Sequence, residues 1–584
     1  AACSEFLLDI GSTTLPPPPE RGHAPTTNCL AAVGVTISDG DIRNAVKALR
    51  GQRASGADDL AAEHVKALNG TNMQLFIDLI HRTWEKQDFI RRSNSTLVKV
   101  LAKRHDATFC SHYRPVSLIQ LIPKIISRIL TTKIGEVAES SLPEWQQGFR
   151  AYRQCLDSIL GIRELVRSHY WKEEKCCLLY LDLEKAFDSV CRKWLEFVLW
   201  DMGLPESVLS LVMKMYATHT FAVKGRNGHG RVAETSRGVR QGCPLSPLLF
   251  IILLSRAVAD WRSDGHISTR WKEKDGTLSG DREPVSGGEE ESLFGDPMRP
   301  PTEGELELKC LGYADDLALI FNSREAAQRG LDSIDLALRK YGLRINPGKC
   351  AFQEIARPKV FAGNSPAAPL TLRGVEIPES PETRYLGSQI SIHADDGPDV
   401  RARMQKGTQR AYKLRRVLRD QSLPKALRIR VLHVFVYPCV TYGAESWALS
   451  KQQRKKLDVW WRKLLRTITG TNQHEEHKTN EELLLLANRS KNLTTMIDNR
   501  RLRYTGHVAR YPAERIVRQA MFGRWNTTSS GPRARKCRSW QDQVRTQLVQ
   551  HGLDIHDEKD SYRNQLNEIY ANQDLIVEEP QAQS

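Results

Sequence analysis

The stretch LGYADDLALIF, residues 311–321, places Asp315 and Asp316 side by side inside an otherwise apolar segment. The apolar runs on both sides predict two buried strands joined by a short turn. Buried carboxylates are costly unless a cation or hydrogen-bond donors neutralise them, and adjacent like charges raise each other's pKa. A solvent-exposed turn is the simpler interpretation, because Asp is a common turn residue. The rest of the chain must decide between an exposed turn and a cation site.

Composition favours a multidomain protein with a polyanionic partner. The chain has 584 residues, 40% of them hydrophobic, and a formal net charge of +16. A chain of this length exceeds what one core usually serves, and this excess of positive charge fits nucleic acid. The most apolar run, residues 245–261, is too short for a membrane span and contains Pro247 and Arg256. It is expected to be a core helix, so no membrane partner is predicted.

A second carboxylate follows another apolar run, in KCCLLYLDLEKAFDSV. Residues 178–181 predict a strand that ends at Asp182, and a helix is expected to begin near Asp188 or Ser189. If this strand neighbours the Asp315 hairpin, three carboxylates converge. Two Mg²⁺ ions about 3.5–4 Å apart would neutralise such a cluster, activate an attacking hydroxyl and stabilise a leaving phosphate.

A third segment, RGVRQGCPLSPLLF, contains Gly-x-x-x-Gly-x-Pro directly before the expected core helix. Glycines there would let backbone N–H groups and the Gln241 side chain approach a phosphate or sugar closely.

Three further segments differ in composition. Residues 1–35 are expected to be a linker or disordered, and residues 263–306, which are acidic and poor in apolar residues, a disordered insert. Residues 401–430 carry eleven basic residues against Asp420 alone, which favours phosphate contacts over a solvated helix face. The residues predicted here to bind nucleic acid are Arg401, Lys413, Arg415, Arg416 and Arg419.

The order of these motifs resembles the reverse transcriptases of non-LTR (LINE-type) retrotransposons. YLDLEKAFDSV is similar to the first catalytic motif, RGVRQGCPLSPLLF to the second, and GYADDLALIF to the Tyr-x-Asp-Asp box. GLRINPGKC, TRYLGSQI, HYRPVSLIQLIPKIISRIL and QQGFRAYRQCLDSI resemble further polymerase motifs, and the tail segments containing YGAESW and TGHVAR resemble the thumb and post-thumb region. The resemblance covers residues 40–550 approximately.

The resemblance implies a right-hand polymerase of the α+β class with a basic helical carboxyl-terminal extension. Fingers and palm are expected over residues 36–392, a helical thumb over 393–470 and the extension over 471–584. The implied reaction is the copying of template RNA into DNA by adding dNTPs to a primer 3′-hydroxyl. The expected cofactor is a pair of Mg²⁺ ions, with Mn²⁺ as a substitute.

The resemblance also implies roles for individual residues. Asp182, Asp315, Asp316 and the Leu183 carbonyl would bind metal. Phe187 would exclude the ribose 2′-hydroxyl, and Lys349 would protonate the departing pyrophosphate. The remaining substrate-binding residues would be Gln241, Gly242 and Arg114.

Some features depart from the family pattern. Ala57 and Asp59 stand where the family has proline and a turn glycine, and Cys350 stands in place of a threonine. No endonuclease domain, zinc knuckle or carboxyl-terminal nuclease is recognisable, so a separate or upstream endonuclease is an expected partner. The expected location is the nucleus, with a cytoplasmic ribonucleoprotein stage. Two alternatives stay open: a maturase-like intron reverse transcriptase, and a decayed or domesticated copy that binds RNA without catalysis.

Overall fold

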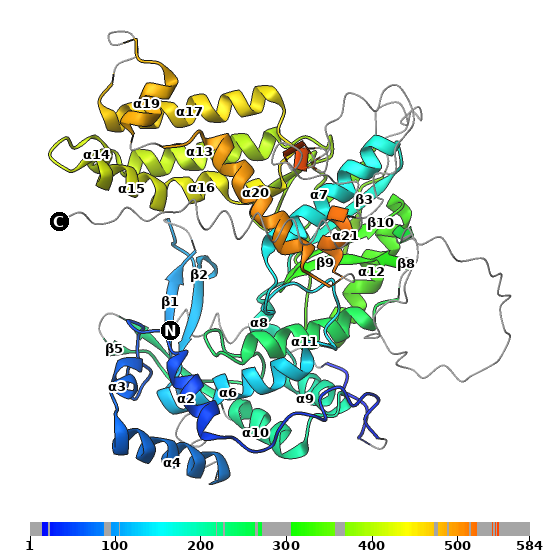
Figure 1. Ribbon diagram of the computed structural model, residues 1–584. Helices are drawn as coiled ribbons and strands as arrows, with labels where there is room; N and C mark the ends of the chain where they lie inside the picture. The colour runs from blue at the N-terminus through cyan, green and yellow to red at the C-terminus, as the bar shows by residue number, and fades with distance from the viewer. Residues whose placement is uncertain are drawn as a thin grey trace.

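A computed structural model describes most of the chain between residues 15 and 547. The described ranges are 15–21, 24–86, 95–103, 106–217, 219–225, 228–262, 267–270, 305–356, 368–471, 477–487, 490–512, 515–522, 540, 543–544 and 546–547. Within them, helices outnumber strands, and a small sheet lies between two helical regions (Figure 1). Every helix in these ranges is too short or too polar to cross a membrane.

A four-stranded antiparallel sheet forms the palm, in the order β11–β3–β10–β9. Its strands are β3 (Cys176–Leu181), β9 (Cys310–Tyr313), β10 (Asp316–Phe321) and β11 (Ala351–Ile355). Every residue of β3 is buried. Because strand side chains alternate between faces, this burial requires cover on both sides of the sheet. Leu179 and Leu181 accordingly belong to one apolar core, and Leu178 and Tyr180 to another.

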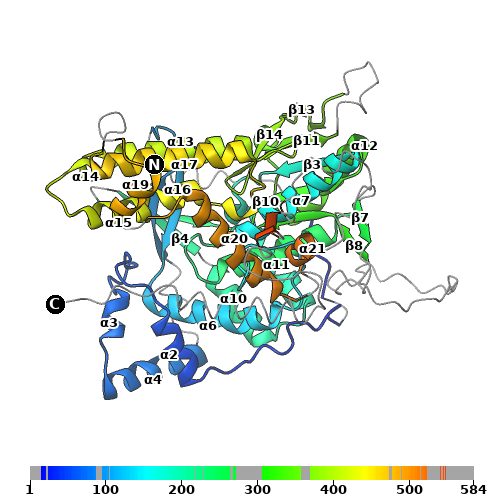
Figure 2. The ribbon, with the colours of Figure 1, turned by 45° about the horizontal axis from the view of Figure 1, so that its top comes forward.

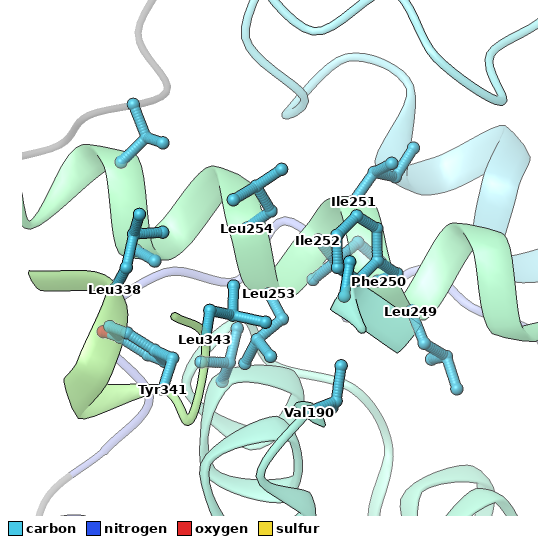
Figure 3. Packing of buried hydrophobic residues seen from close by; sticks show 14 of the residues in the cluster. Val190, Leu249, Phe250, Ile251, Ile252, Leu253, Leu254, Leu338, Tyr341 and Leu343 are labelled. Carbon is cyan, nitrogen blue, oxygen red and sulfur yellow. The ribbon is translucent and has the colours of Figure 1, made fainter. Parts of the chain in front are cut away.

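Helices cover the two faces of the palm sheet. The larger core contains residues of α9 (Arg192–Asp201), α11 (Ser246–Ala259) and α12 (Arg324–Lys340). On the other face lies α7 (Cys155–Lys172), whose Ile162 and Leu165 pack against the second set of strand residues. The predicted core helix is therefore α11, and Figure 3 shows its apolar residues among Val190, Tyr341 and Leu343.

A second sheet forms the fingers, in the order β2–β1–β4–β5, with β6 paired to β4. Its strands are β1 (Ser95–Ala102), β2 (Tyr113–Leu118), β4 (His219–Gly225), β5 (Gly228–His229) and β6 (Ala233–Thr235). The helices of this region are α2 (Asp39–Lys47), α3 (Ala62–Lys66), α4 (Gly70–Lys86), α6 (Leu121–Ala138) and α10 (Glu206–Ala217). Ser38 caps α2 and forms a reciprocal capping box with Asp41, which satisfies backbone donors at the helix start.

The thumb has a separate apolar core built around Trp447 and Trp461. Its helices are α13 (Gly397–Lys413), α14 (Arg415–Arg419), α15 (Lys425–Phe435), α16 (Tyr437–Thr441), α17 (Lys451–Thr469) and α19 (Asn480–Leu486). The chain then returns to the palm through α20 (Leu493–Ala509) and α21 (Ile516–Phe522), where the Tyr504 hydroxyl donates to Asp157 on α7 over 2.7 Å. Figure 2 shows α20 and α21 beside α7, on the palm side of the thumb.

Short elements complete the fold. They are β7 (Ile267–Arg270), β8 (Glu305–Leu308), β12 (Thr371–Leu372), β13 (Val375–Glu376), β14 (Glu382–Tyr385), β15 (Ser388–Ser391), α8 (Ala186–Ser189) and the 3₁₀ turns η1 (Cys110–His112), η2 (Pro347–Lys349) and η4 (Ala444–Ser446). The predicted α+β right-hand polymerase fold is confirmed. The fingers strands β1 and β2 precede palm strand β3 in the sequence, β4 to β6 follow it, and the helical thumb comes after the palm.

The structure differs from the sequence prediction at two segments. Within residues 1–35, Leu30 is fully buried, and the Thr26 hydroxyl donates to Asp201 over 2.5 Å, so this part packs on the palm without forming a helix or strand. Within residues 263–306, β7 pairs with β8, so the two ends of the predicted insert are joined as a ladder. Residues 271–304, on which most of the disorder prediction falls, lie outside the described residues, as do residues 1–14.

Buried ion pairs join the thumb to the palm. Arg163 on α7 donates to Asp399 of α13 over 2.6 Å, and Arg167 donates to Asp396 over 2.6 Å. Asp399 is only 1% exposed and also accepts from the Trp447 indole N–H and the Gln389 backbone N–H. Burial alone would raise the pKa of Asp399, but Arg163 and these donors bring it below its ordinary value. The carboxylate is therefore charged and fully engaged.

Replacing Asp399 with Ala should destabilise the junction between thumb and palm. The change removes the nearer of the two buried carboxylates that contact Arg163, the other being Asp396 at 3.2 Å. Breaking a buried ion pair costs about 3–5 kcal/mol in comparable sites, so the remaining Asp396 contact makes this an upper bound. Thermal and urea denaturation would measure the loss. The control is Arg401→Ala, two residues along the same helix, where the side chain is 70% exposed and forms an ion pair with Glu382 over 3.4 Å. Equal stability of the two variants would contradict the role given to this ion pair.

Candidate active site

The two aspartates of the opening stretch occupy a tight hairpin turn. Tyr313 pairs with Asp316 across β9 and β10, which leaves Ala314 and Asp315 as the two residues of the turn. Ala314 has a φ of +58°, in the left-handed region that non-glycine residues rarely adopt. Such two-residue turns with a positive φ match the twist of antiparallel strands. The turn is thus the predicted hairpin, and it projects Asp315 from the end of the sheet.

Asp182 lies at the same end of the sheet, directly after β3. Leu181 pairs with Leu317, so the next positions along the two strands are Asp182 and Asp316. The Asp182 backbone carbonyl accepts from the Asn346 N–H over 2.9 Å, which ties it to the segment before η2. The sheet register therefore brings together the two motifs that the sequence separated.

Electrostatic coupling among the carboxylates follows from this proximity. Burial raises the pKa of Asp315, and the Asp182 charge raises it further. Burial, then Asp315 and then Asp182, raise the pKa of Asp316 to about 6. Protonation of these groups would relieve the repulsion, and so would a bound cation.

The donor set of this site fits a hard divalent ion. Carboxylate oxygens are the ligands that Mg²⁺ prefers, and Mg²⁺ sites in phosphoryl-transfer enzymes use one or two carboxylates together with water and substrate phosphates. Among the described residues, no three Asp, Glu, His or Cys side chains gather closely enough to hold an ion by themselves.

Three cations surround the carboxylates. Lys349, on η2, places its Nζ 3.3 Å from a carboxylate oxygen of Asp182. Arg114, on β2, and Lys349 both act to lower the pKa of Asp315. Lys103 follows β1, and burial is the largest cause that lowers its pKa. The positive charges of Lys349 and Arg114 lower this pKa further, and the negative charges of Asp188 and Asp182 act against them. Sequence reasoning missed Lys103, although a basic residue directly after a fingers strand was a usable signal.

The second motif packs against Phe187 and Asp188 of α8. The Gln241 Nε2 donates to Asp188 over 3.1 Å, and the Val239 N–H donates to the Phe187 carbonyl over 2.8 Å. Asp188 is therefore a partner of Gln241, and the expected helix start there is wrong: α8 ends at Ser189, and Cys191 precedes α9. The structure thus joins the first and second motifs.

Aromatic contacts fix the ring of Phe187. It stacks on Phe250 of α11, with centroids 4.9 Å apart and planes 16° apart, and Phe149 meets it edge-on at 6.1 Å. Phe149 is half exposed, so this pair presents an aromatic surface next to the second motif. The sequence did not single out Phe149.

Gly242 is required by close packing. Its φ is +116°, and a Cβ at this position would lie 2.7 Å from the Ser117 carbonyl oxygen on β2. The Ser117 N–H also donates to the Gln241 carbonyl over 2.7 Å. These contacts dock the Gln241–Gly242 loop on the fingers strand that carries Arg114.

Comparison with known proteins agrees with this geometry. Residues 101–390 match the family described as reverse transcriptase (RNA-dependent DNA polymerase). They are a reverse transcriptase domain. The predicted resemblance to the enzymes of non-LTR retrotransposons is confirmed, because the chain's relatives carry the names of such elements.

Three of these relatives show how far the similarity extends. A probable RNA-directed DNA polymerase from transposon BS of Drosophila melanogaster is 23% identical over 477 residues, which cover 76% of this chain and 47% of that protein. The RNA-directed DNA polymerase from mobile element jockey of Drosophila funebris is 21% identical, covering 77% and 46%. The Pol polyprotein from the R2DM element of Drosophila melanogaster is 24% identical, covering 67% and 35%. The chain thus spans about half the length of these relatives, or less.

Asp188, which is half-buried, gives the site a pH-dependent stability. Burial raises its pKa to about 6 from an ordinary 3.8. A raised folded-state pKa means that the stability contribution is complete below the unfolded pKa and is lost as the pH rises through about 6. Asp188→Asn keeps an acceptor for Gln241. It should therefore increase the free energy of unfolding at pH 8 by at most about 3 kcal/mol and raise the melting temperature accordingly. The gain should shrink towards pH 4.

Melting curves of wild type and variant across this pH range measure the effect. Asp78→Asn on exposed α4 is the control, since that carboxylate is open to water. A gain that is the same at pH 4 and pH 8 would show that ionisation of Asp188 is not its cause.

Proposed function

We propose that this chain is the RNA-directed DNA polymerase of a non-LTR retrotransposon, which copies template RNA into DNA from a primer 3′-hydroxyl. The observation that carries the proposal is the meeting of Asp182 and the Asp315 turn at one end of the palm sheet. The reverse transcriptase domain implies binding of a nucleic-acid template and primer. The dNTP substrates, and a separate or upstream endonuclease as partner, are part of the proposal. So is a nuclear location with a cytoplasmic ribonucleoprotein stage.

Divalent metal is the cofactor that the family generally uses, and we propose a pair of Mg²⁺ ions, replaceable by Mn²⁺. Asp182 and Asp315 would hold both ions, and Asp316 and the Leu183 carbonyl would complete the site. When bound, such ions activate the attacking hydroxyl and stabilise the leaving oxygen of an in-line displacement.

The surrounding residues have complementary roles in the proposal. Lys103, Arg114 and Lys349 place positive charge where a triphosphate would meet the carboxylates. Lys349, with 65% of its side chain exposed, is able to reach a departing pyrophosphate and give it a proton. Phe187, held by Phe250, would close the space beside C2′ of the sugar, and Gln241 would contact the incoming nucleotide and template base.

The proposed nucleic-acid contacts of the thumb depend on charges that are free to reach a phosphate. The side chains of the five predicted residues are all exposed: Arg401, Lys413, Arg415, Arg416 and Arg419. Two other cations of the same block are buried and serve the fold instead. Arg403 pairs with Asp399 and donates to the Gly387 carbonyl, and Arg428 donates to the Ile468 carbonyl. More of the positive charges in this block are therefore engaged within the protein than the sequence indicates.

The direct test of the proposal is primer extension on an RNA template with the purified protein and Mg²⁺. Asp315→Asn removes one charge from the cluster with little change of shape. Extension should fall by about 100-fold or more, because even an outer-shell partner of a metal site is worth 10–100-fold. Template–primer affinity should stay within about twofold, since the thumb supplies those contacts. Extension by the variant at the wild-type rate would show that Asp315 is not a ligand.

The exposed thumb cations should contribute to the salt dependence of template–primer binding. Changing Lys413, Arg415, Arg416 and Arg419 together to Gln removes up to four phosphate contacts. The slope of log affinity against log salt should flatten by up to about 0.9 per lost contact, and affinity should fall for all sequences alike.

A matched variant separates specific contacts from loss of net charge. Lys451, Lys455, Lys456 and Lys463 are equally exposed, on α17 of the same region. Changing these four to Gln alters the net charge equally. Identical slopes for the two quadruple variants would show that the block around α14 makes no particular contact with nucleic acid.

A further inference from the structure

A segment between α6 and α7 lies along the edge of the palm sheet. Gln146 forms a parallel bridge with Gly312 of β9, where the Gly312 N–H donates to the Trp145 carbonyl and the Gln147 N–H donates to the Gly312 carbonyl, each over 2.8 Å. These bonds extend the sheet by a short strand-like piece. The side chain of Gln146 is fully buried and points towards the turn between β9 and β10.

The Gln146 amide binds both backbone polar groups of Ala314. Its Oε1 accepts from the Ala314 N–H over 2.8 Å and from the Gly148 N–H over 2.9 Å. Its Nε2 donates to the Ala314 carbonyl over 3.2 Å. The amide orientation follows from these partners, because two N–H groups require an oxygen and a carbonyl requires an N–H. One side chain thus satisfies the backbone of a turn residue that lies outside the ladder of β9 and β10.

Ala314 needs such support because of its conformation. A left-handed φ costs an L-residue about 1–2 kcal/mol relative to the right-handed region. The Ala314 carbonyl also belongs to the peptide group that joins Ala314 to Asp315, so holding that carbonyl orients the backbone of Asp315. Gly148 adds a steric constraint, since a Cβ there would lie 2.2 Å from the Ala314 nitrogen.

We propose that Gln146 is a positioning residue, which sets the Asp315 carboxylate relative to Asp182 by fixing the Ala314 peptide. The proposal rests on the proposed function, because it makes Gln146 a determinant of divalent-metal affinity at the polymerase site. A buried glutamine that merely satisfies its own hydrogen bonds would affect folding alone. The two roles differ in what they do to metal binding by folded protein.

The test compares Gln146→Met with Gln147→Met. Both remove a buried amide and keep the side-chain length. Gln147 is 3% exposed, and its side chain donates to the Glu144 carbonyl and accepts from Arg153. Within the described residues, neither of these side-chain hydrogen bonds goes to the turn. Each protein is measured in complex with an RNA–DNA template–primer. Electron paramagnetic resonance of free Mn²⁺ gives the metal affinity, and thermal denaturation, template–primer affinity and the Mg²⁺ dependence of extension are recorded beside it.

Gln146→Met should weaken Mn²⁺ binding by about 10-fold and lower extension by about 10–100-fold, with template–primer affinity within about twofold. Gln147→Met should lower the melting temperature comparably and leave Mn²⁺ affinity unchanged. Equal Mn²⁺ affinities for the two variants would overturn the proposal. Absence of both extension and Mn²⁺ binding in the wild type would instead overturn the proposed function, so the two failures are distinguishable.

Ala314→Gly tests in a second way whether Gln146 acts through the Ala314 turn. Glycine adopts a positive φ without penalty, so the turn depends less on Gln146 when Ala314 is replaced. The Mn²⁺ loss caused by Gln146→Met should therefore be smaller in the Ala314→Gly background, whereas the effects of Gln147→Met and Ala314→Gly should add. If Gln146→Met is insoluble, Gln146→Asn, which keeps an amide but withdraws it from Ala314, is compared with Gln147→Asn, and equal Mn²⁺ affinities for these two variants would overturn the proposal.

Discussion

Asp182 and Asp315 carry like charges at one end of the palm sheet, and the surrounding fold must offset their repulsion. Asp182 ends β3, Asp315 occupies the turn before β10, and the pairing of these strands forces the two together. A fold that places like charges in a partly buried position must supply positive charge or lose stability. The positive charge comes from separate parts of the chain: from Lys349 in the segment after α12, and from Lys103 and Arg114 in the fingers.

The remaining architecture holds that sheet end in place. Helices on both faces bury all of β3 and every residue of β10 after Asp316. The register of these two strands is therefore unable to slip without moving apolar side chains between two cores. The thumb is fixed to α7 by buried pairs such as Arg163–Asp399, and α20 and α21 return to the same helix. Buried ion pairs add little stability over apolar packing but penalise any rearrangement that leaves one charge alone. The thumb is thereby attached to the helix that backs the catalytic sheet.

Much of the site was predictable because its signals are local. An apolar run ending in Asp182, an apolar hairpin around Asp315 and a glycine-rich loop before α11 each specify their own backbone conformation. The charge of the thumb was predictable only in part. Arg403 and Arg428 look like their neighbours in the sequence, yet they point inward, because burial of a long cationic side chain depends on a carbonyl or carboxylate from another helix. The packing of Leu30 on the palm was missed for a similar reason, since an irregular segment carries no periodicity.

Three properties follow directly from the sequence: the order of the polymerase motifs, the strand ends that carry the aspartates and the basic character of the chain. These depend on residue type and on spacing within one element. Folding brings Gln241 to Asp188, Lys349 to Asp182 and Gln146 to the peptide before Asp315. Each of these contacts joins residues that are distant in the sequence. A side-chain hydrogen bond acts over about 3 Å, so only the folded path of the chain establishes which distant residues come within that distance.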